Sequence, residues 1–118
     1  MGHRRIHTGA PWEAVVGYCR AVVASGASVS VAGTTAVGDD GELVGVGDAP
    51  APAARCLKLI EHALREAGAE LSDIVRTRMY VTNIDDWAAV AQAHRETFGD
   101  APPATTMVEV SRLMDPRM

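Results

Sequence analysis

The sequence has few large aromatic residues and no long hydrophobic run. One Phe, two Trp and two Tyr stand among 118 residues, so Ala and Val must fill most of the core. Gly, Ser, Asp or Arg interrupts every apolar stretch before the roughly 18 to 20 residues that cross a bilayer. No apolar segment follows the basic residues near the start, as a secretory signal would require. We therefore expect a soluble, cytoplasmic protein without membrane contact.

Cysteine and positive charge are also scarce. Cys19 and Cys56 lie far apart without metal-binding spacing, which predicts two buried thiols in a reducing compartment and no metal site. The net charge of −4 repels polyanions, so we expect no nucleic-acid partner. A dinucleotide fingerprint would need a third glycine after Gly45 and Gly47, but Pro50 stands there. We expect no cofactor.

The N-terminal half has the pattern of short strands followed by a helix. The length predicts one domain covering residues 1–118. Residues 4–8 favour a short strand, while residues 19–25 and 28–33 predict an antiparallel hairpin across a Gly-Ala turn. Apolar residues then recur at helical spacing over about 51–67, with Gly68 as the stop. On the outer face of that helix, Glu61 and Arg65 form an i,i+4 pair.

The C-terminal half predicts a strand, a helix and another strand. Residues 73–83 alternate, with Thr77 and Met79 on one face and Arg76, Arg78 and Tyr80 on the other. A helix follows from Asp85 or Asp86 to Gly99, and a strand from about 105 to 112. We predict an α+β two-layer fold, a mixed sheet with two helices on one face. The uncovered apolar face predicts a homo-oligomer.

Several polar residues have both a structural and a functional interpretation. His94 lies on the apolar side of its helix, which favours a core or interface histidine over a ligand. Glu109, within a strand, favours an ion pair with Arg78 or Arg112 over catalysis. The stripe formed by Arg76, Arg78 and Tyr80 predicts a solvated or intersubunit face, with an anion-binding wall as the alternative. No GxSxG motif supports serine nucleophile chemistry.

Four segments together resemble the RidA family, also called YjgF/YER057c/UK114. They are GYCRAV (17–22), VSVAGTTA (29–36), AGAELSDIVRTRMYVTNIDDW (67–87) and PATTMVEVSRL (103–113). The resemblance implies a chorismate mutase-like fold, a homotrimer with a central barrel, and small-molecule clefts between subunits. It also implies hydrolysis of enamines and imines to ketoacids and ammonia. A ligand-binding or regulatory trimer without chemistry is the alternative, and RNA cleavage is disfavoured by the acidic charge.

The same resemblance implies a set of ligand-binding residues and three departures from the family pattern. The implied contacts are Tyr18, Gly33, Asp85, Thr105, Thr106 and Met107, with Arg78 as a substitute cation. Thr105 stands where the family has an arginine that clamps the substrate carboxylate, and Met107 where it has a cysteine, so the chain resembles an arginine-lacking branch. A hydroxyl cannot replace that bidentate grip. The family continues into another strand with a water-positioning glutamate, but the sequence stops at Met118. Either the chain is truncated or that strand is absent, so the catalytic residue is unknown.

Overall fold

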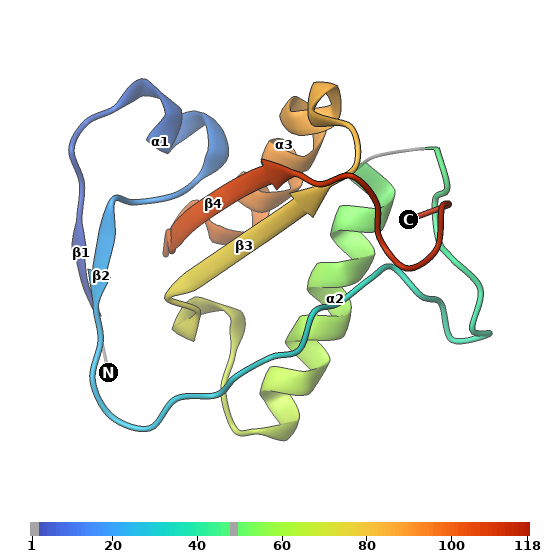
Figure 1. Cartoon of the computed structure of the whole chain (residues 1–118). Helices are drawn as coiled ribbons and strands as arrows, with labels where there is room; N and C mark the ends of the chain where they lie inside the picture. The colour runs from blue at the N-terminus through green and yellow to red at the C-terminus, as the bar shows by residue number, and fades with distance from the viewer. Residues whose placement is uncertain (1–2, 48–49) are drawn as a thin grey trace.

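The computed structural model describes residues 3–47 and 50–118 of the chain. Its strands are β1 (Arg4–Ile6), β2 (Ala21–Val23), β3 (Arg76–Val81) and β4 (Ala104–Glu109). Its α-helices are α1 (Pro11–Val16), α2 (Pro50–Glu66) and α3 (Trp87–Phe98). Two 3-10 turns, η1 (Leu71–Asp73) and η2 (Ile84–Asp86), flank β3. The predicted α+β class is confirmed, with helices and small sheets in separate layers (Figure 1).

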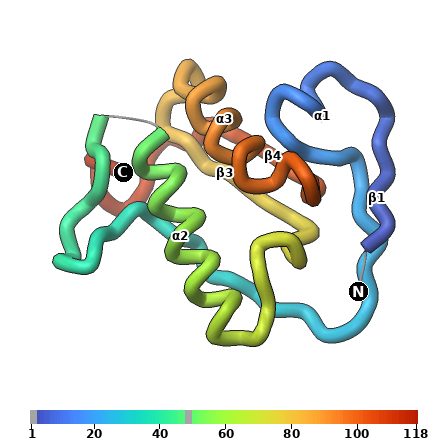
Figure 2. Tube along the Cα trace, turned by 180° about the vertical axis from the view of Figure 1, so that it is seen from behind, coloured from blue at the N-terminus to red at the C-terminus, as the bar shows by residue number. Residues whose placement is uncertain are grey.

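Strands β3 and β4 form the central parallel pair. Thr77 lies opposite Thr105, and Arg78 opposite Thr106. Exposure alternates along β3 as predicted, because residues of even number face outward and those of odd number are half-buried. Figures 1 and 2 show α2 and α3 together on one side of this pair. On the opposite side of β3 and β4, called the open face below, no helix of the described residues lies over the strands (Figure 1).

The four strands form two small sheets in place of the single mixed sheet that the sequence predicts. Strands β1 and β2 pair antiparallel, with Ile6 opposite Ala21, while β3 and β4 pair parallel. One parallel bridge between Cys19 and Ala104 links the two pairs. The described part of the chain therefore has two two-stranded sheets, one of each kind, joined at a single point.

The predicted hairpin of residues 19–25 and 28–33 is wrong. Strand β2 pairs with β1 instead, and residues 28–33 are exposed and outside any strand. At Gly26 the backbone has a φ of 95° and the chain leaves the sheet. It then crosses to α2, where the Thr34 carbonyl accepts a hydrogen bond from Cys56 Sγ at 3.4 Å. The alternating valines of residues 28–33 indicate an extended backbone, but they do not indicate which strand, if any, that segment pairs with.

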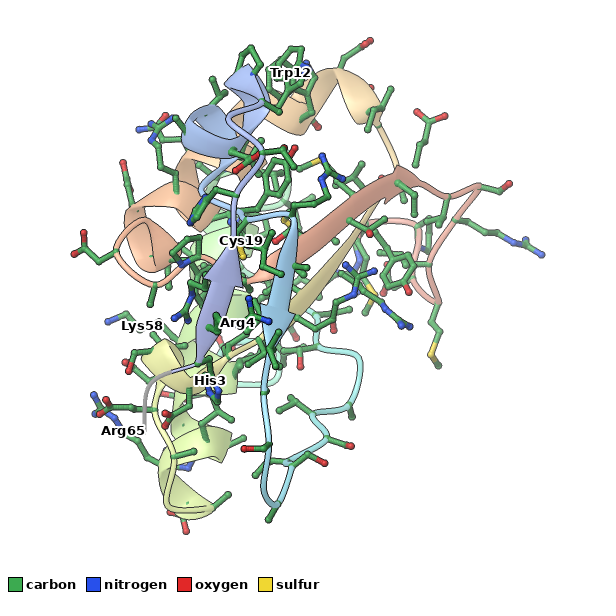
Figure 3. The ribbon with its side chains drawn as sticks, turned by 90° about the vertical axis from the view of Figure 1, so that its left-hand side faces the viewer. His3, Arg4, Trp12, Cys19, Lys58 and Arg65 are labelled. Carbon is green, nitrogen blue, oxygen red and sulfur yellow. The ribbon has the colours of Figure 1, made fainter. Side chains whose placement is uncertain are left out.

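Helix α2 follows the periodicity of its apolar residues. Its bounds lie within one residue of the predicted 51–67. Gly68 ends it with a φ of 82°, and the next N–H, that of Ala69, donates to the Leu64 carbonyl at 2.8 Å. The predicted Glu61–Arg65 ion pair is present at 3.3 Å, and Figure 3 shows Arg65 directed away from the body of the molecule.

Helix α3 also begins and ends as predicted, between Asp86 and Gly99. Its cap differs, since no side-chain cap is made by Asp86 and the Asn83 side chain instead accepts from Asp85 N at 3.0 Å. The helix buries Ala91, His94 and Phe98. Among the described residues, no helix is both long and apolar enough to cross a membrane.

The sequence analysis missed helix α1, although local signals for it exist. Pro11 occupies the first turn, where its missing N–H costs nothing. The Glu13 side chain accepts from the Ala10 N–H at 3.2 Å, and Gly17 ends the helix with a φ of 81°. Six residues are too few for a hydrophobic period to be recognised.

Candidate functional site

A buried polar chain joins helix α3 to both central strands. His94 is 3% exposed and lies on α3. Its Nε2 lies 2.9 Å from the hydroxyl of Thr77 on β3, which is 2.7 Å from the hydroxyl of Thr105 on β4. The Nδ1 of His94 lies 2.9 Å from the Val16 carbonyl. The prediction that His94 is a core histidine is confirmed.

The direction of each hydrogen bond in this chain follows from chemistry. A carbonyl only accepts, so His94 Nδ1 carries the proton and donates to Val16. Burial lowers the pKa of His94, against a smaller raising effect of that hydrogen bond, and the ring is neutral. Nε2 therefore accepts from Thr77, whose oxygen accepts in turn from Thr105. The hydroxyl proton of Thr105 is directed into the protein.

Three consecutive predicted site residues divide between the two sides of the sheet. Thr105 and Met107 are half-buried on the side of Thr77 and the helices. Thr106 is exposed on the open face, where its hydroxyl accepts from Arg76 Nη2 at 2.8 Å. Arg78 lies opposite Thr106 in the strand register and lines the same hollow. Within one chain, Thr106 and Arg78 come together and Thr105 and Met107 do not join them.

The remaining predicted site residues lie elsewhere on the chain. Tyr18 is half-buried, and its hydroxyl accepts from Arg20 Nη2 at 3.5 Å. The guanidinium of Arg20 also makes a cation–π contact with the ring, at 5.7 Å from its centroid. Gly33 is in the exposed segment before α2. Asp85 is exposed in η2. In residues 3–47 and 50–118, no hydrogen bond joins these three to the rest of the predicted set.

Glu109 makes a different contact from the one predicted. The sequence favoured an ion pair with Arg78 or Arg112, but Glu109 Oε1 accepts from the backbone N–H of Ile84 at 3.0 Å. Strand β4 ends beside η2, where the first N–H groups of a helical turn lack partners. The carboxylate therefore has a structural role, as expected, with a backbone donor in place of an arginine.

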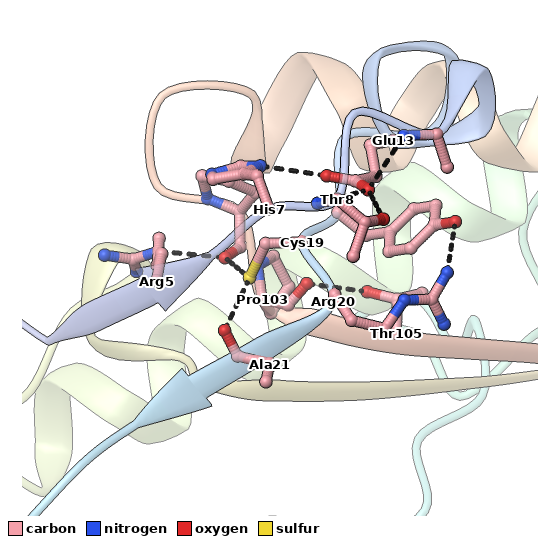
Figure 4. A network of polar contacts seen from close by, with 12 residues as sticks. Arg5, His7, Thr8, Glu13, Cys19, Arg20, Ala21, Pro103 and Thr105 are labelled. Carbon is pink, nitrogen blue, oxygen red and sulfur yellow. Dashed lines mark hydrogen bonds and ion pairs between the residues drawn. The ribbon is translucent and has the colours of Figure 1, made fainter.

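Glu13 is the buried carboxylate that sequence reasoning did not single out. It is 7% exposed and accepts from the Thr8 hydroxyl at 2.6 Å, from Thr8 and Ala10 N–H groups, and from His7 at 3.0 Å (Figure 4). The Thr8 side chain is the largest cause that lowers the pKa of Glu13, to about 2, while burial acts in the opposite direction. Glu13 fixes the loop before α1.

The two cysteines are free thiols. Cys19 is 1% exposed, as predicted, whereas Cys56 is only half-buried. Burial raises the pKa of both thiols, which leaves little reactive thiolate. Cys19 Sγ donates to the carbonyl of Pro102 at 3.1 Å, and Figure 4 shows this link from the N-terminal strands to the β4 loop. The described residues include no cluster of three metal-ligating side chains.

Comparison with known proteins identifies close relatives. The family model described as endoribonuclease L-PSP matches residues 8–118. An uncharacterised protein of Streptomyces coelicolor is 37% identical over 98% of this chain and 84% of its own length. The 3-aminoacrylate deaminase RutC of Acinetobacter baylyi is 32% identical over 70% of this chain and 65% of its own length.

Solved structures agree with this match. A Mycobacterium tuberculosis member of the YjgF/YER057c/UK114 family is 43% identical, with a TM-score of 0.68 over 98% of this chain and 91% of the other. The Rid-family protein YyfB of Yersinia pestis is 33% identical, with a TM-score of 0.86 over 99% and 92%. The chain therefore belongs to the endoribonuclease L-PSP family, whose members include the RidA/YjgF and RutC proteins.

Proposed function

We propose that this chain forms a RidA-like homotrimer with the chorismate mutase-like barrel, and that it hydrolyses imines or enamines in clefts between subunits. The observation that carries the proposal is the family match over residues 8–118. One of the similar proteins, RutC of Acinetobacter baylyi, is named as a 3-aminoacrylate deaminase. An enamine first tautomerises to the imine by gaining a proton at carbon and losing one at nitrogen; water then adds to the C=N carbon, the C–N bond breaks, and a carbonyl compound and ammonia leave.

The ligand contacts proposed for the cleft come from more than one protomer. They are Tyr18, Gly33, Asp85, Thr105, Thr106, Met107 and Arg78. The scatter of these residues over one chain fits a cleft that only assembly completes. Because Thr105 replaces a cation, neutral donors such as the Gly33 N–H and the Tyr18 hydroxyl would orient the substrate.

The surface area of the single chain is consistent with assembly. The chain exposes 7720 Å², whereas a monomer of 12.4 kDa exposes roughly 6,100 Å². An isolated chain with this much exposed surface has area to bury against other copies.

A second candidate is ligand binding without turnover, and the position of Thr105 favours it. Its hydroxyl is already engaged with Thr77 and cannot donate to a substrate without breaking the buried chain. RNA cleavage, the activity in the family's description, is disfavoured by the net charge of −4.

Ammonia release from a panel of imines and enamines, including 3-aminoacrylate formed in situ, tests the proposal. We expect rates above buffer, and we expect Tyr18→Phe to reduce them. Thermal shift with the corresponding ketoacids runs in parallel. Stabilisation by a ligand without ammonia release would support the second candidate and reject the enzyme.

A further inference from the structure

The open face of β3 and β4 carries a cluster of hydrogen-bond donors around a hollow. Its outward side chains are Arg76, Arg78 and Tyr80 from β3, and Thr106 and Val108 from β4. The hollow measures about 270 Å³, and Met79 completes its lining. Arg76 and Arg78 are two residues apart on one strand face, so their backbones are roughly 6.6 Å apart.

Neither arginine has a carboxylate partner within the described residues. The ion pairs there involve Arg55, Arg65, Arg117 and His7. The carboxylate of Glu109, at the end of β4, is engaged by the backbone of Ile84. Two like charges on one strand face repel each other. The open face is thus a local positive site on a chain whose net charge is −4.

Thr106 is positioned to complete an anion site. Its oxygen accepts from Arg76 Nη2 at 2.8 Å, which leaves its own hydroxyl proton free to donate outward. Arg78 lies directly across from Thr106 in the register, and no hydrogen bond occupies its guanidinium among the described residues. Guanidinium groups bind carboxylates and phosphates with paired, charge-assisted hydrogen bonds.

We propose that this hollow binds a small oxyanion, a carboxylate or a phosphate, between Arg76, Arg78 and the Thr106 hydroxyl. The site shares Arg78 and Thr106 with the contacts proposed for the cleft and to that extent rests on the proposed function, but anion binding needs no turnover and its three residues come from one chain. It also lies on the opposite side of the sheet from Thr105 and Met107.

Titration with inorganic phosphate and with acetate tests the site. Binding is followed by calorimetry and by the backbone amide NMR signals of β3 and β4, with sodium chloride at matched ionic strength as the reference. We expect saturable binding of at least one anion, which also distinguishes the phosphate from the carboxylate class. We expect Arg78→Gln to weaken it about tenfold or more, and Arg78→Lys to weaken it less.

Arg4→Gln is the matched control, since Arg4 is exposed on β1 and the change in charge is the same. Its affinity should stay within about twofold of the wild type. Equal weakening by Arg4→Gln and Arg78→Gln would reduce the effect to net charge and overturn the site. The absence of saturable binding would also overturn the site. This outcome includes the case in which a carboxylate of another copy already binds Arg76 and Arg78. Ammonia release, measured without either anion, reports separately on the proposed function.

Discussion

Glu13 shows how much order one buried carboxylate can impose. Its two oxygens accept from His7, from both donors of Thr8 and from the Ala10 N–H. These donors hold the entry to α1 in place, and the ionised form is the one they favour. The stabilising contribution of Glu13 therefore depends on pH.

Replacement of Glu13 by Gln should lower the unfolding midpoint by several degrees at pH 7. The folded pKa of about 2 lies below the ordinary value of 4.5. The unfolded chain thus binds more protons between these values, and the contribution of Glu13 is complete above pH 4.5 and lost as pH falls toward 2. The gap between wild type and Glu13→Gln should narrow over that range in thermal melts.

Glu42→Gln provides the control for this series, because Glu42 is exposed in a loop and its side chain makes no hydrogen bond among the described residues. It should melt like the wild type at every pH. A gap between wild type and Glu13→Gln that stays constant from pH 7 to pH 3 would contradict the assigned role.

Single residues could be predicted from the sequence when their local pattern decided their surroundings. His94 falls on the apolar face of a strongly periodic helix, so its burial was predictable. Its partners Thr77 and Thr105 were not, because the register of β3 against β4 depends on contacts distant in sequence. Glu109 found a backbone donor for the same reason, since the approach of η2 to β4 is a tertiary event.

Helices α1 and α3 meet where Gly17 ends α1. A Cβ at Gly17 would lie 2.6 Å from the Cα of Arg95, and the φ there is 81°. Trp12 and Trp87 contact edge to face at 5.5 Å in the same interface. The two helices approach this closely only because residue 17 lacks a side chain.

Gly17→Ala should destabilise the protein by about 2 to 4 kcal/mol, through left-handed strain and the clash with Arg95. The melting temperature should then fall by roughly 10 °C or more. Gly9→Ala is the matched control, with a φ of 75° and no atom within 4 Å of the added Cβ. It carries the strain alone and should cost less. Equal melting temperatures for the two variants would refute the close approach.

The predicted helices were more accurate than the predicted strand pairing, because a helix is defined by local sequence patterns and a strand pair is not. Helices α2 and α3 have a sustained apolar period and a terminal glycine, so their bounds were correct within about a residue. The predicted hairpin was wrong because β2 pairs with β1, which precedes it on the other side of α1, and not with residues 28–33, which follow it directly. Pairing of strands is the step that local patterns leave undecided.

The chain leaves several large apolar side chains exposed. Val29, Val31, Tyr80 and Val108 are each between 40% and 53% exposed, and Tyr80 and Val108 lie on the open face. The sequence predicted this exposure, because it has few aromatic residues for the core and because both predicted helices lie on one side of the sheet. The surface that would cover these residues could not be predicted, because the contact between separate chains leaves no pattern within one sequence.

Sedimentation analysis should give a mass three times the 12.4 kDa of one chain. Val108→Lys adds a positive charge beside Arg76 and Arg78 on the open face and should shift the assembly toward monomers, since an unpaired buried charge is costly at an interface. Val46→Lys makes the same change at a residue that is 55% exposed in the loop before α2, and should leave the mass unchanged. A wild-type mass of one chain would reject the trimer.

The attachment of β1 and β2 to the β4 loop has a consequence for synthesis on the ribosome. The Pro102 carbonyl accepts from Arg5 Nε at 2.8 Å and from Cys19 Sγ, and the Pro103 carbonyl accepts from the Cys19 N–H at 2.9 Å. Pro102 and Pro103 emerge from the exit tunnel well after β1, β2 and Cys19. The nascent N-terminal strands therefore stay undocked until the β4 loop has emerged.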